Sequence, residues 1–287
     1  MKGPRTPRSF VFHAHAFAIS GMIKYPYHEP IPTQAMVTLP TIGGHAEALV
    51  ENFSFHNMVS FKKAYTQVIG RSNDAGDICY TTTSVTIEGL NIMDMFTADL
   101  ITTRIGSTYN LHDIDDPNDD TADVLVLGSN FDGVRIGGSK TKIELDQKTF
   151  SDYPQYETLK DKYNKDSDFR QKVNNEFYCN PMPPNVPEPV KTRYKWADRL
   201  KLKERLPDNG PVLCTLVKNI EGDTVDGHVF GNIIDLPNFG TIYLADLYIE
   251  KFSKRLEMVR IDLAPPFSGT ICDGGGSNGS GYPPSGT

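Results

Sequence analysis

The stretch from residue 79 to residue 146 most constrains what this chain can fold into. Its first part, residues 81–104, reads TTTSVTIEGLNIMDMFTADLITTR and contains no proline. Thr, Val and Ile dominate it, and such β-branched residues lose rotamer freedom in a helix but fit a pleated surface. Val85 and Ile87 alternate with polar neighbours, which is the pattern of a half-buried strand. We expect an interruption at Gly89, followed by a strand that is covered on both faces.

The second part of this stretch predicts shorter strands. An apolar run at residues 124–127 is followed by alternating runs at 131–136 and 141–145, with Gly137 and Gly138 between the last two. Glycine accepts positive φ without a Cβ clash. The glycine pair therefore predicts a tight hairpin.

Further strand patterns lie on both sides of this stretch, separated by turn sequences. They cover residues 10–23, 34–39, 48–71 with a break at Asn57, 212–220, 228–236, 240–248 and 256–263. Alternating short strands predict a mainly β protein: an antiparallel β-sandwich or barrel-like fold with a charged α-helical insertion. A short β-solenoid is the alternative, with corners near Gly89 and Gly133, although no fixed repeat period supports it.

The insertion is the segment 147–206. Residues 156–177 are highly charged, with apolar residues near helical spacing, and predict one broken helix or two short ones with Ser167 as an N-cap. The sequence PMPPNVPEPV at 181–190 predicts an extended linker, and residues 196–206 predict one more short helix. The expected organisation is therefore a β-rich first half at 1–146, a helical and Pro-rich insertion at 147–206, a β-rich second half at 207–270 and a Gly/Ser-rich tail at 271–287.

Glycine and serine dominate that C-terminal segment, which contains CDGGGSNGSGYPPSGT from residue 272 to the end. Chains of this composition behave as flexible coils. We expect a flexible tail, which would be ordered only if something held it in place, such as a neighbouring subunit.

Charge and hydropathy exclude some partners. A net charge of -7 argues against nucleic acid, which requires clustered Lys and Arg. No apolar run reaches about 18 residues, so we expect no membrane span. Residues 1–10 are basic but contain two prolines and no apolar core, which does not match a signal peptide. We therefore expect a cytoplasmic protein, or one exported by a route that needs no such peptide.

The four cysteines lie far apart in the sequence, at Cys79, Cys179, Cys214 and Cys272. No CxxC pair is present, so a zinc ribbon is not indicated. We interpret them as ordinary thiols, with disulfides as the alternative.

Two histidines are candidates for a metal site such as zinc. His13 and His15 have the same parity in the expected first strand and would point the same way, about 7 Å apart. Such a pair can bind a metal when one or two further ligands join it. The alternative is a half-exposed strand face, because no nearby acidic or cysteine residue completes a set.

A run of acidic residues, HDIDDPNDDTAD at 112–123, is a candidate for binding Ca²⁺. Asp113, Asp115 and Asp119 could supply oxygen ligands. The spacing differs from the EF-hand loop, since a proline interrupts it and no glutamate closes it. The alternative is an acidic surface loop that binds nothing.

Three segments together resemble the choice-of-anchor P family of bacterial proteins. They are VTIEGLNIMDMFTADLITTRIGS at 85–107, GSNFDGVRIGG at 128–138 and IIDLPNFGTIYLADL at 233–247. The resemblance covers about a third of the chain, and its motifs are short and mostly structural. It implies a β framework and a cell-surface location, and it supplies no catalytic residues. The chain departs from the family in its charged insertion and in having no evident export signal or anchor.

Two hypotheses for function do not involve catalysis. The first is a structural protein that assembles through unpaired strand edges into a homo-oligomer or a larger assembly. The second is a module that binds carbohydrate or another ligand on exposed aromatic side chains. The candidate tyrosines are Tyr25, Tyr27, Tyr153 and Tyr156.

A metal-dependent enzyme is the third hypothesis. No nucleophile elbow, phosphate-binding loop, HExxH or dinucleotide motif is present in the sequence. His45 and His228 each follow a glycine, where a catalytic base could lie if they joined His13 and His15 around a carboxylate. We expect a protein that is not an enzyme and has no resident cofactor.

Overall fold

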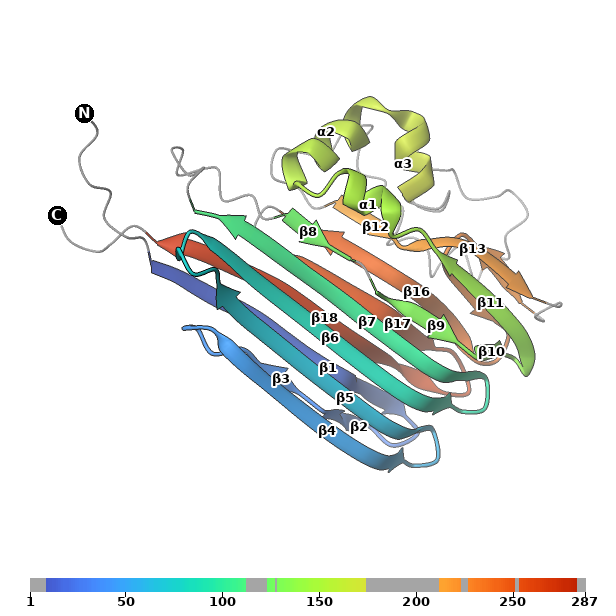
Figure 1. Ribbon diagram of the computed structural model, residues 1–287. Coiled ribbons are helices and arrows are strands. Elements are labelled where there is room, and N and C mark those ends of the chain that lie inside the picture. The colour runs from blue at the N-terminus through green and yellow to red at the C-terminus, as the bar shows by residue number, and fades with distance from the viewer. Residues whose placement is uncertain are drawn as a thin grey trace, which may run out of the picture.

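A computed structural model shows two antiparallel sheets packed face to face (Figure 1). The structure describes residues 9–111, 123–126, 128–173, 212–222, 227–250 and 253–282. Over these residues the two sheets do not close into a barrel, and every strand pair is antiparallel, unlike a β-solenoid. The predicted β-sandwich is confirmed, and the barrel and solenoid alternatives are wrong.

The back sheet has the order β14-β15-β16-β17-β18-β1-β2, with β12 beside β16 and β3 beside β1. Its strands are β1 (Ser9–Tyr25), β2 (Glu29–Gln34), β3 (Val37–Thr38), β12 (Val212–Thr215), β14 (His228–Phe230), β15 (Ile233–Leu236), β16 (Gly240–Ile249), β17 (Lys254–Leu263) and β18 (Ser268–Tyr282).

The front sheet has the order β13-β11-β10-β7-β6-β5-β4, with β8 and β9 also pairing with β7. Its strands are β4 (Gly44–Phe55), β5 (Val59–Ser72), β6 (Ile78–Ile92), β7 (Phe96–Asn110), β8 (Asp123–Leu125), β9 (Asn130–Asp132), β10 (Arg135–Ile136), β11 (Ser139–Leu145) and β13 (Val217–Gly222).

Tight turns join the front strands. Gly137 and Gly138 both have positive φ and connect β10 to β11, as predicted. The expected break at Asn57 is the β4–β5 turn, where Asn57 has a φ of 55°. The β6–β7 turn lies at Met93 and Asp94, whose φ values are 53° and 56°. Two successive left-handed residues match the right-handed twist of a hairpin.

Gly89 does not interrupt the strand in which it lies. The register of β6 with both neighbours continues past it, although its φ is 63°. Asn52 in β4 and Gly133 after β9 are also left-handed, with φ of 55° and 60°. These residues lie on one line across the sheet, with Lys62 and Asp99 between them. A Cβ on Gly89 would lie 2.8 Å from Lys62 Cγ, and glycine adopts the positive φ here without that contact.

At this line, the side chains that face the interior change from odd-numbered to even-numbered positions, or the reverse, in each long strand of the front sheet. In β6 the buried apolar positions Val85 and Ile87 are followed by Leu90 and Ile92. The same reversal occurs in β4, β5 and β7. Read as one continuous alternation, the sequence after Gly89 would therefore place apolar residues on both faces. In fact each half of the strand alternates regularly, and the alternation shifts by one residue at the line.

Buried threonines of the front sheet bond directly to residues of the opposite layer, in β18 and just after β2. Thr66 Oγ1 donates to the carbonyl of Ala35 at 2.5 Å, and Thr83 Oγ1 donates to the carbonyl of Gly276 at 3.0 Å. Thr103 Oγ1 donates to Asp273 Oδ2 at 2.8 Å. A buried hydroxyl must find a partner, and these threonines find theirs across the sandwich. The threonine-rich strands thus form part of the interior.

The predicted C-terminal tail is wrong for residues 271–282. They belong to β18, which pairs with β17 on one side and β1 on the other. The glycines allow close packing, since a Cβ on Gly275 would lie 2.8 Å from Thr83 Cγ2 and one on Gly276 would lie 2.7 Å from His15 Cε1. The segment is held by its own chain, so its order gives no support to a neighbouring subunit.

The predicted strand at 212–220 is divided between the two sheets. β12 pairs with β16 in the back sheet, and β13 pairs with β11 in the front sheet. Leu216 lies at the crossing, where its N–H donates to the carbonyl of Ala245 at 3.0 Å. The chain therefore changes layers in the middle of one apolar run.

Three short helices lie together beside β8 and β12: α1 (Lys148–Asp152), α2 (Tyr156–Lys165) and α3 (Ser167–Val173) (Figure 1). One broken helix or two short helices were expected within 156–177, and the structure describes α2 and α3 there. The cap of α3 is Asp166 rather than Ser167, because Asp166 Oδ1 accepts the Phe169 N–H at 2.9 Å. The linker at 181–190 and the helix at 196–206 lie outside the described residues. None of the described helices is long and apolar enough to cross a membrane.

Candidate self-association edge

The predicted metal ligands do not form a site in the part of the chain that is described. His13 and His15 are exposed on β1, and the described residues hold no cluster of three or more His, Cys, Asp or Glu side chains suited to a metal. Burial and the nearby Arg255 guanidinium lower the pKa of His15. Asp113, Asp115 and Asp119 lie outside the described residues.

The histidines proposed for catalysis do not converge either. His45 lies on β4 in the front sheet, and His228 lies on β14, at the end of the back sheet opposite to β2. Four strands separate β14 from β1, which carries His13 and His15. The structure therefore does not bring these histidines together, and the geometric condition set for the enzyme hypothesis is not met by them.

The four tyrosines proposed as a platform are also separated. Tyr156 is fully buried in α2, and Tyr153 packs edge-on against Phe169 with ring centroids 5.0 Å apart. Tyr25 and Tyr27 are exposed at the far end of β1. The predicted set is therefore reduced to these two side chains.

Tyr27 belongs to a small aromatic cluster. Its ring stacks on His56, with centroids 4.0 Å apart and planes 9° apart. His56 Nε2 is 2.8 Å from a carboxylate oxygen of Glu29, and its ring meets Phe55 edge-on. The cluster links β2 to the β4–β5 turn, and Tyr27 is 43% exposed.

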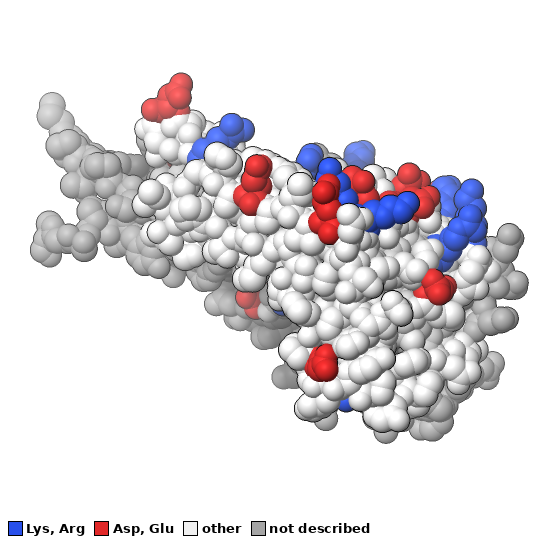
Figure 2. Space-filling model, turned by 90° about the horizontal axis from the view of Figure 1, so that it is seen from below, with Lys and Arg blue, Asp and Glu red and all other residues white. Residues whose placement is uncertain are grey.

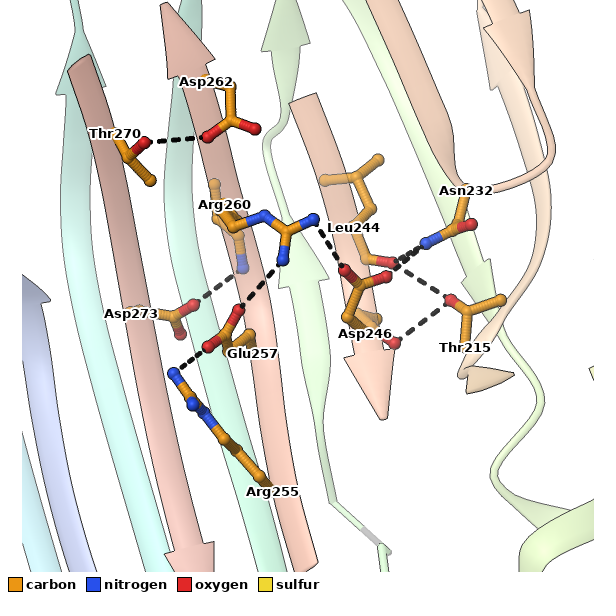
Figure 3. A network of polar contacts seen from close by, with 12 residues as sticks. Thr215, Asn232, Leu244, Asp246, Arg255, Glu257, Arg260, Asp262, Thr270 and Asp273 are labelled. Carbon is orange, nitrogen blue, oxygen red and sulfur yellow. Dashed lines mark hydrogen bonds and ion pairs between the residues drawn. The ribbon is translucent and has the colours of Figure 1, made fainter. Parts of the chain in front are cut away.

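A polar network lies on the back sheet (Figure 3). The Arg260 guanidinium lies 3.6 Å from Asp246 Oδ2 and 3.9 Å from Glu257 Oε2, and Glu257 also pairs with Arg255. Burial alone would lower the pKa of Arg260, but the neighbouring carboxylates raise it above its usual range. Arg260 also lies over the Tyr243 ring, 4.0 Å from its centroid.

This network surrounds an irregular point in β16. Ala245 is buried and has a φ of 50°, which is unusual for alanine. Thr215 Oγ1 lies 3.1 Å from the Ala245 carbonyl, and Asn232 Nδ2 donates to the Leu244 carbonyl at 3.0 Å and to Asp246 Oδ1 at 2.7 Å. These side chains satisfy the backbone groups where the strand bends.

Asp273 occupies the interior beneath the network. Its Oδ1 accepts the Val259 N–H at 2.7 Å, where β17 has a bulge against β18, and its Oδ2 accepts the Thr103 hydroxyl. Burial raises the pKa of Asp273 to about 7, against the opposing effect of these two hydrogen bonds.

The chemistry of this region favours a structural role. Burial raises the pKa of Cys272 to about 12 and that of Cys214 well above its usual value, so neither thiol is an activated nucleophile. Asp246 and Glu257 both pair with arginines. The network thus fixes the register of β16, β17 and β18 around two irregular strands.

The edges of the two sheets differ greatly in length. β4 ends the front sheet with 12 residues and, among the described strands, pairs with β5 alone. The other sheet ends are β13 and β2, with 6 residues each, and β14, with 3. β2 also contains Pro30 and Pro32, which cannot donate to a further strand. β4 is therefore the sheet end that can best accept another strand.

Exposed apolar side chains lie on β4 and in the segment that leads into it. Ile42 and Leu49 are 91% and 54% exposed, and Met36 is 59% exposed just before β3. Figure 2 looks onto this edge, where Lys, Arg, Asp and Glu gather along the upper border and leave most of the face uncharged. Long strand edges with exposed apolar groups are typical association sites.

The sequence suggests association through a strand edge but does not indicate which strand forms that edge. The position of β4 at the end of a sheet depends on strand order, which alternating patterns do not encode. A usable signal was Leu49, an apolar residue at a position of the polar parity that His45, Glu47 and Glu51 share.

Comparison with known proteins identifies a family. A family profile described as "Domain of unknown function (DUF8256)" matches residues 10–250, which ends before β17 and β18. Searches of curated proteins and of solved structures found no match. The resemblance to the choice-of-anchor P family stays a prediction, since none of these findings bears on it. The match covers well over half of the 287 residues, so the chain belongs to the family described as a domain of unknown function, DUF8256.

Proposed function

We propose that this protein is a non-catalytic structural protein that assembles with copies of itself through the β4 edge. The observation that carries the proposal is the 12-residue length of β4 at the end of the front sheet. An unpaired edge presents N–H and C=O groups to which a further strand can bond. The other sheet ends are at most half as long.

Side chains beside the edge add a hydrophobic contribution. Association through β4 would cover Leu49 and would bring Ile42 and Met36 close to a second molecule. Each square ångström of apolar surface removed from water contributes roughly 25 cal/mol. Strand pairing supplies direction, and these side chains supply the favourable free energy.

The test adds a charge to the edge without disturbing the interior. Leu49→Glu places a third acidic residue between Glu47 and Glu51 on the outward face of β4. Leu125→Glu is the matched control, because Leu125 is 45% exposed on β8, away from this edge. Mass in solution is measured by light scattering for the wild-type protein and both variants, with circular dichroism as a check on folding.

We expect the wild-type protein and Leu125→Glu to form oligomers and Leu49→Glu to be monomeric at the same concentration. A wild-type protein that stays monomeric at every concentration would contradict the proposal. Equal oligomer formation by all three folded proteins would exclude β4 as the contact.

A second candidate function is ligand binding at the Tyr27 cluster. The stacked Tyr27 and His56 rings, with the Glu29 carboxylate beside them and Tyr25 60% exposed nearby, offer an aromatic face and an acceptor of the kind that sugars contact. Screening on a glycan array compares the wild-type protein with Tyr27→Ala. Glycan binding that this substitution abolishes would favour the second function, and an array without binding would count against it.

A further inference from the structure

We infer that the strand added at this edge is β4 of a second copy, which runs antiparallel with Ala48 opposite Ala48 across a twofold axis. The inference rests on the proposed function and adds to it the register and the closed symmetry of the contact. It follows from three properties of β4: the faces of its side chains, the positions of its charges and the reversal at Asn52.

The faces of the side chains restrict the possible registers. Ala46, Ala48 and Val50 are half-buried and face the interior, while Glu47 and Leu49 are exposed on the outer face. Side chains directly opposite each other in a sheet lie on the same face. Interior residues must therefore face interior residues, which leaves only registers centred on a residue.

The charges on β4 distinguish favourable registers from unfavourable ones. A contact centred on Ala48 places His45 opposite Glu51 at both ends and Glu47 opposite Leu49. A contact centred on Glu47 places that glutamate opposite itself, and one centred on Leu49 places Glu47 opposite Glu51 twice. Like charges directly opposite each other are unfavourable, and opposite charges are favourable. Of these three registers, only the one centred on Ala48 combines two histidine–glutamate pairs with no glutamate pair.

The change of inward-facing positions at Asn52 excludes a contact centred on Val50. A contact centred on Val50 would place Glu47, which is exposed, opposite Phe53, which faces the interior beyond the reversal. A contact centred on Ala46 would also place His45 opposite Glu47, but it would pair only residues 44–48 of the strand. The Ala48 register instead aligns Gly44 with Asn52, so that pairing ends where the parity of β4 changes.

The resulting assembly is closed. Twofold pairing uses β4 of both copies and joins the two front sheets into one continuous sheet through β7, β6, β5 and β4 of each copy. Since an isologous contact of this kind uses up the edge, the product is a dimer and not a fibre.

Disulfide formation tests the register. Separate substitutions of Glu47, Ala48, Leu49 and Val50 by cysteine each place two sulfurs on the twofold axis only in the register centred on that residue. Cα atoms directly opposite in an antiparallel pair lie about 4.5–5.5 Å apart, within reach of a disulfide. The wild-type protein, oxidised in parallel, gives the background from the natural cysteines.

We expect Ala48→Cys to give the strongest covalent dimer on non-reducing gels. Strongest cross-linking at any other position overturns the register and leaves the proposed function standing. If neither the wild-type protein nor the variants exceed the mass of one copy by light scattering, both the inference and the proposed function fail.

Charge exchange provides a second readout that needs no cysteine. His45→Glu introduces a second carboxylate opposite Glu51 at both ends of the contact and is expected to weaken dimer formation by about tenfold or more. The double variant His45→Glu with Glu51→His restores both pairs and is expected to return most of the affinity. A double variant no tighter than His45→Glu, with both proteins folded, overturns the pairing of these residues.

Discussion

Asp273 should make the stability of this protein fall as pH rises from 5 to 8. Its carboxyl group lies between the sheets, and burial raises its pKa to about 7 from an ordinary value of 3.8. Because the folded-state pKa is the higher one, folding favours the protonated form. The stabilising effect is complete below the unfolded-state pKa and is lost as pH rises through the folded-state pKa.

The magnitude follows from the two pKa values. They differ by about 3 units, and each unit corresponds to about 1.36 kcal/mol, so the complete effect is about 4 kcal/mol. The interval between pH 5 and pH 7 lies between these two pKa values, where the effect is lost progressively. We expect the free energy of unfolding to fall by about 2–3 kcal/mol between pH 5 and pH 8 from this group alone.

Asp273→Asn isolates the contribution. An amide has the size of a carboxyl group but does not titrate, and it can still accept the Val259 N–H and approach the Thr103 hydroxyl. Urea unfolding of both proteins at pH 5, 6, 7 and 8 gives a difference in which the other titrating groups cancel. The wild-type protein should lose stability relative to the variant as pH rises.

A second variant should make the loss of stability with rising pH larger instead of smaller. Thr103→Val removes the hydroxyl that donates to the ionised carboxylate, so the pKa of Asp273 should rise further and the loss on raising pH should be larger. Parallel curves for the wild-type protein and Asp273→Asn across this range would refute the reasoning, because Asp273 would then not titrate there.

Two further predictions concern the back sheet. Gly275→Ala places a Cβ 2.8 Å from Thr83 Cγ2 and should lower the free energy of unfolding by about 1–3 kcal/mol, measured by urea unfolding; unchanged stability would show that the sheets can separate without cost. Arg260→Met leaves Asp246 and Glu257 without their shared guanidinium and should cost about 1–3 kcal/mol at neutral pH, less than a fully buried pair because Arg260 is partly exposed. A cost that is the same when both carboxylates are protonated at low pH would contradict the electrostatic explanation.

Local patterns and turn chemistry predicted most of the framework. The glycine pair at 137–138 and the break at Asn57 are hairpin turns because only residues that tolerate positive φ fit there. The strand segments predicted before and after them exist because β-branched residues alternate at period two. These features depend on neighbours along the chain, which a single sequence contains.

The errors involve contacts between distant residues. β18 looks like a linker because the reason for its glycines lies in Thr83 and His15, which are far away in sequence. Gly89 looks like a break because a parity reversal shared by neighbouring strands cannot be seen in one strand alone. The crossing at Leu216 is hidden inside a single apolar run.

For the candidate site, the sequence suggested the type of contact but not its location. Association through a strand edge was one of three hypotheses, and the identity of the edge required the strand order. The proposed metal ligands His13 and His15 do share one face of β1, as their spacing indicated, but parity says nothing about which side chains other strands bring near them.

The mass of the wild-type protein in solution tests the central claim most directly. Light scattering across a series of concentrations reports whether chains of 31.9 kDa associate. If copies pair through β4, we expect a mass that rises to that of two copies and stays there as concentration increases. A mass that remains at one copy up to the highest soluble concentration would contradict it.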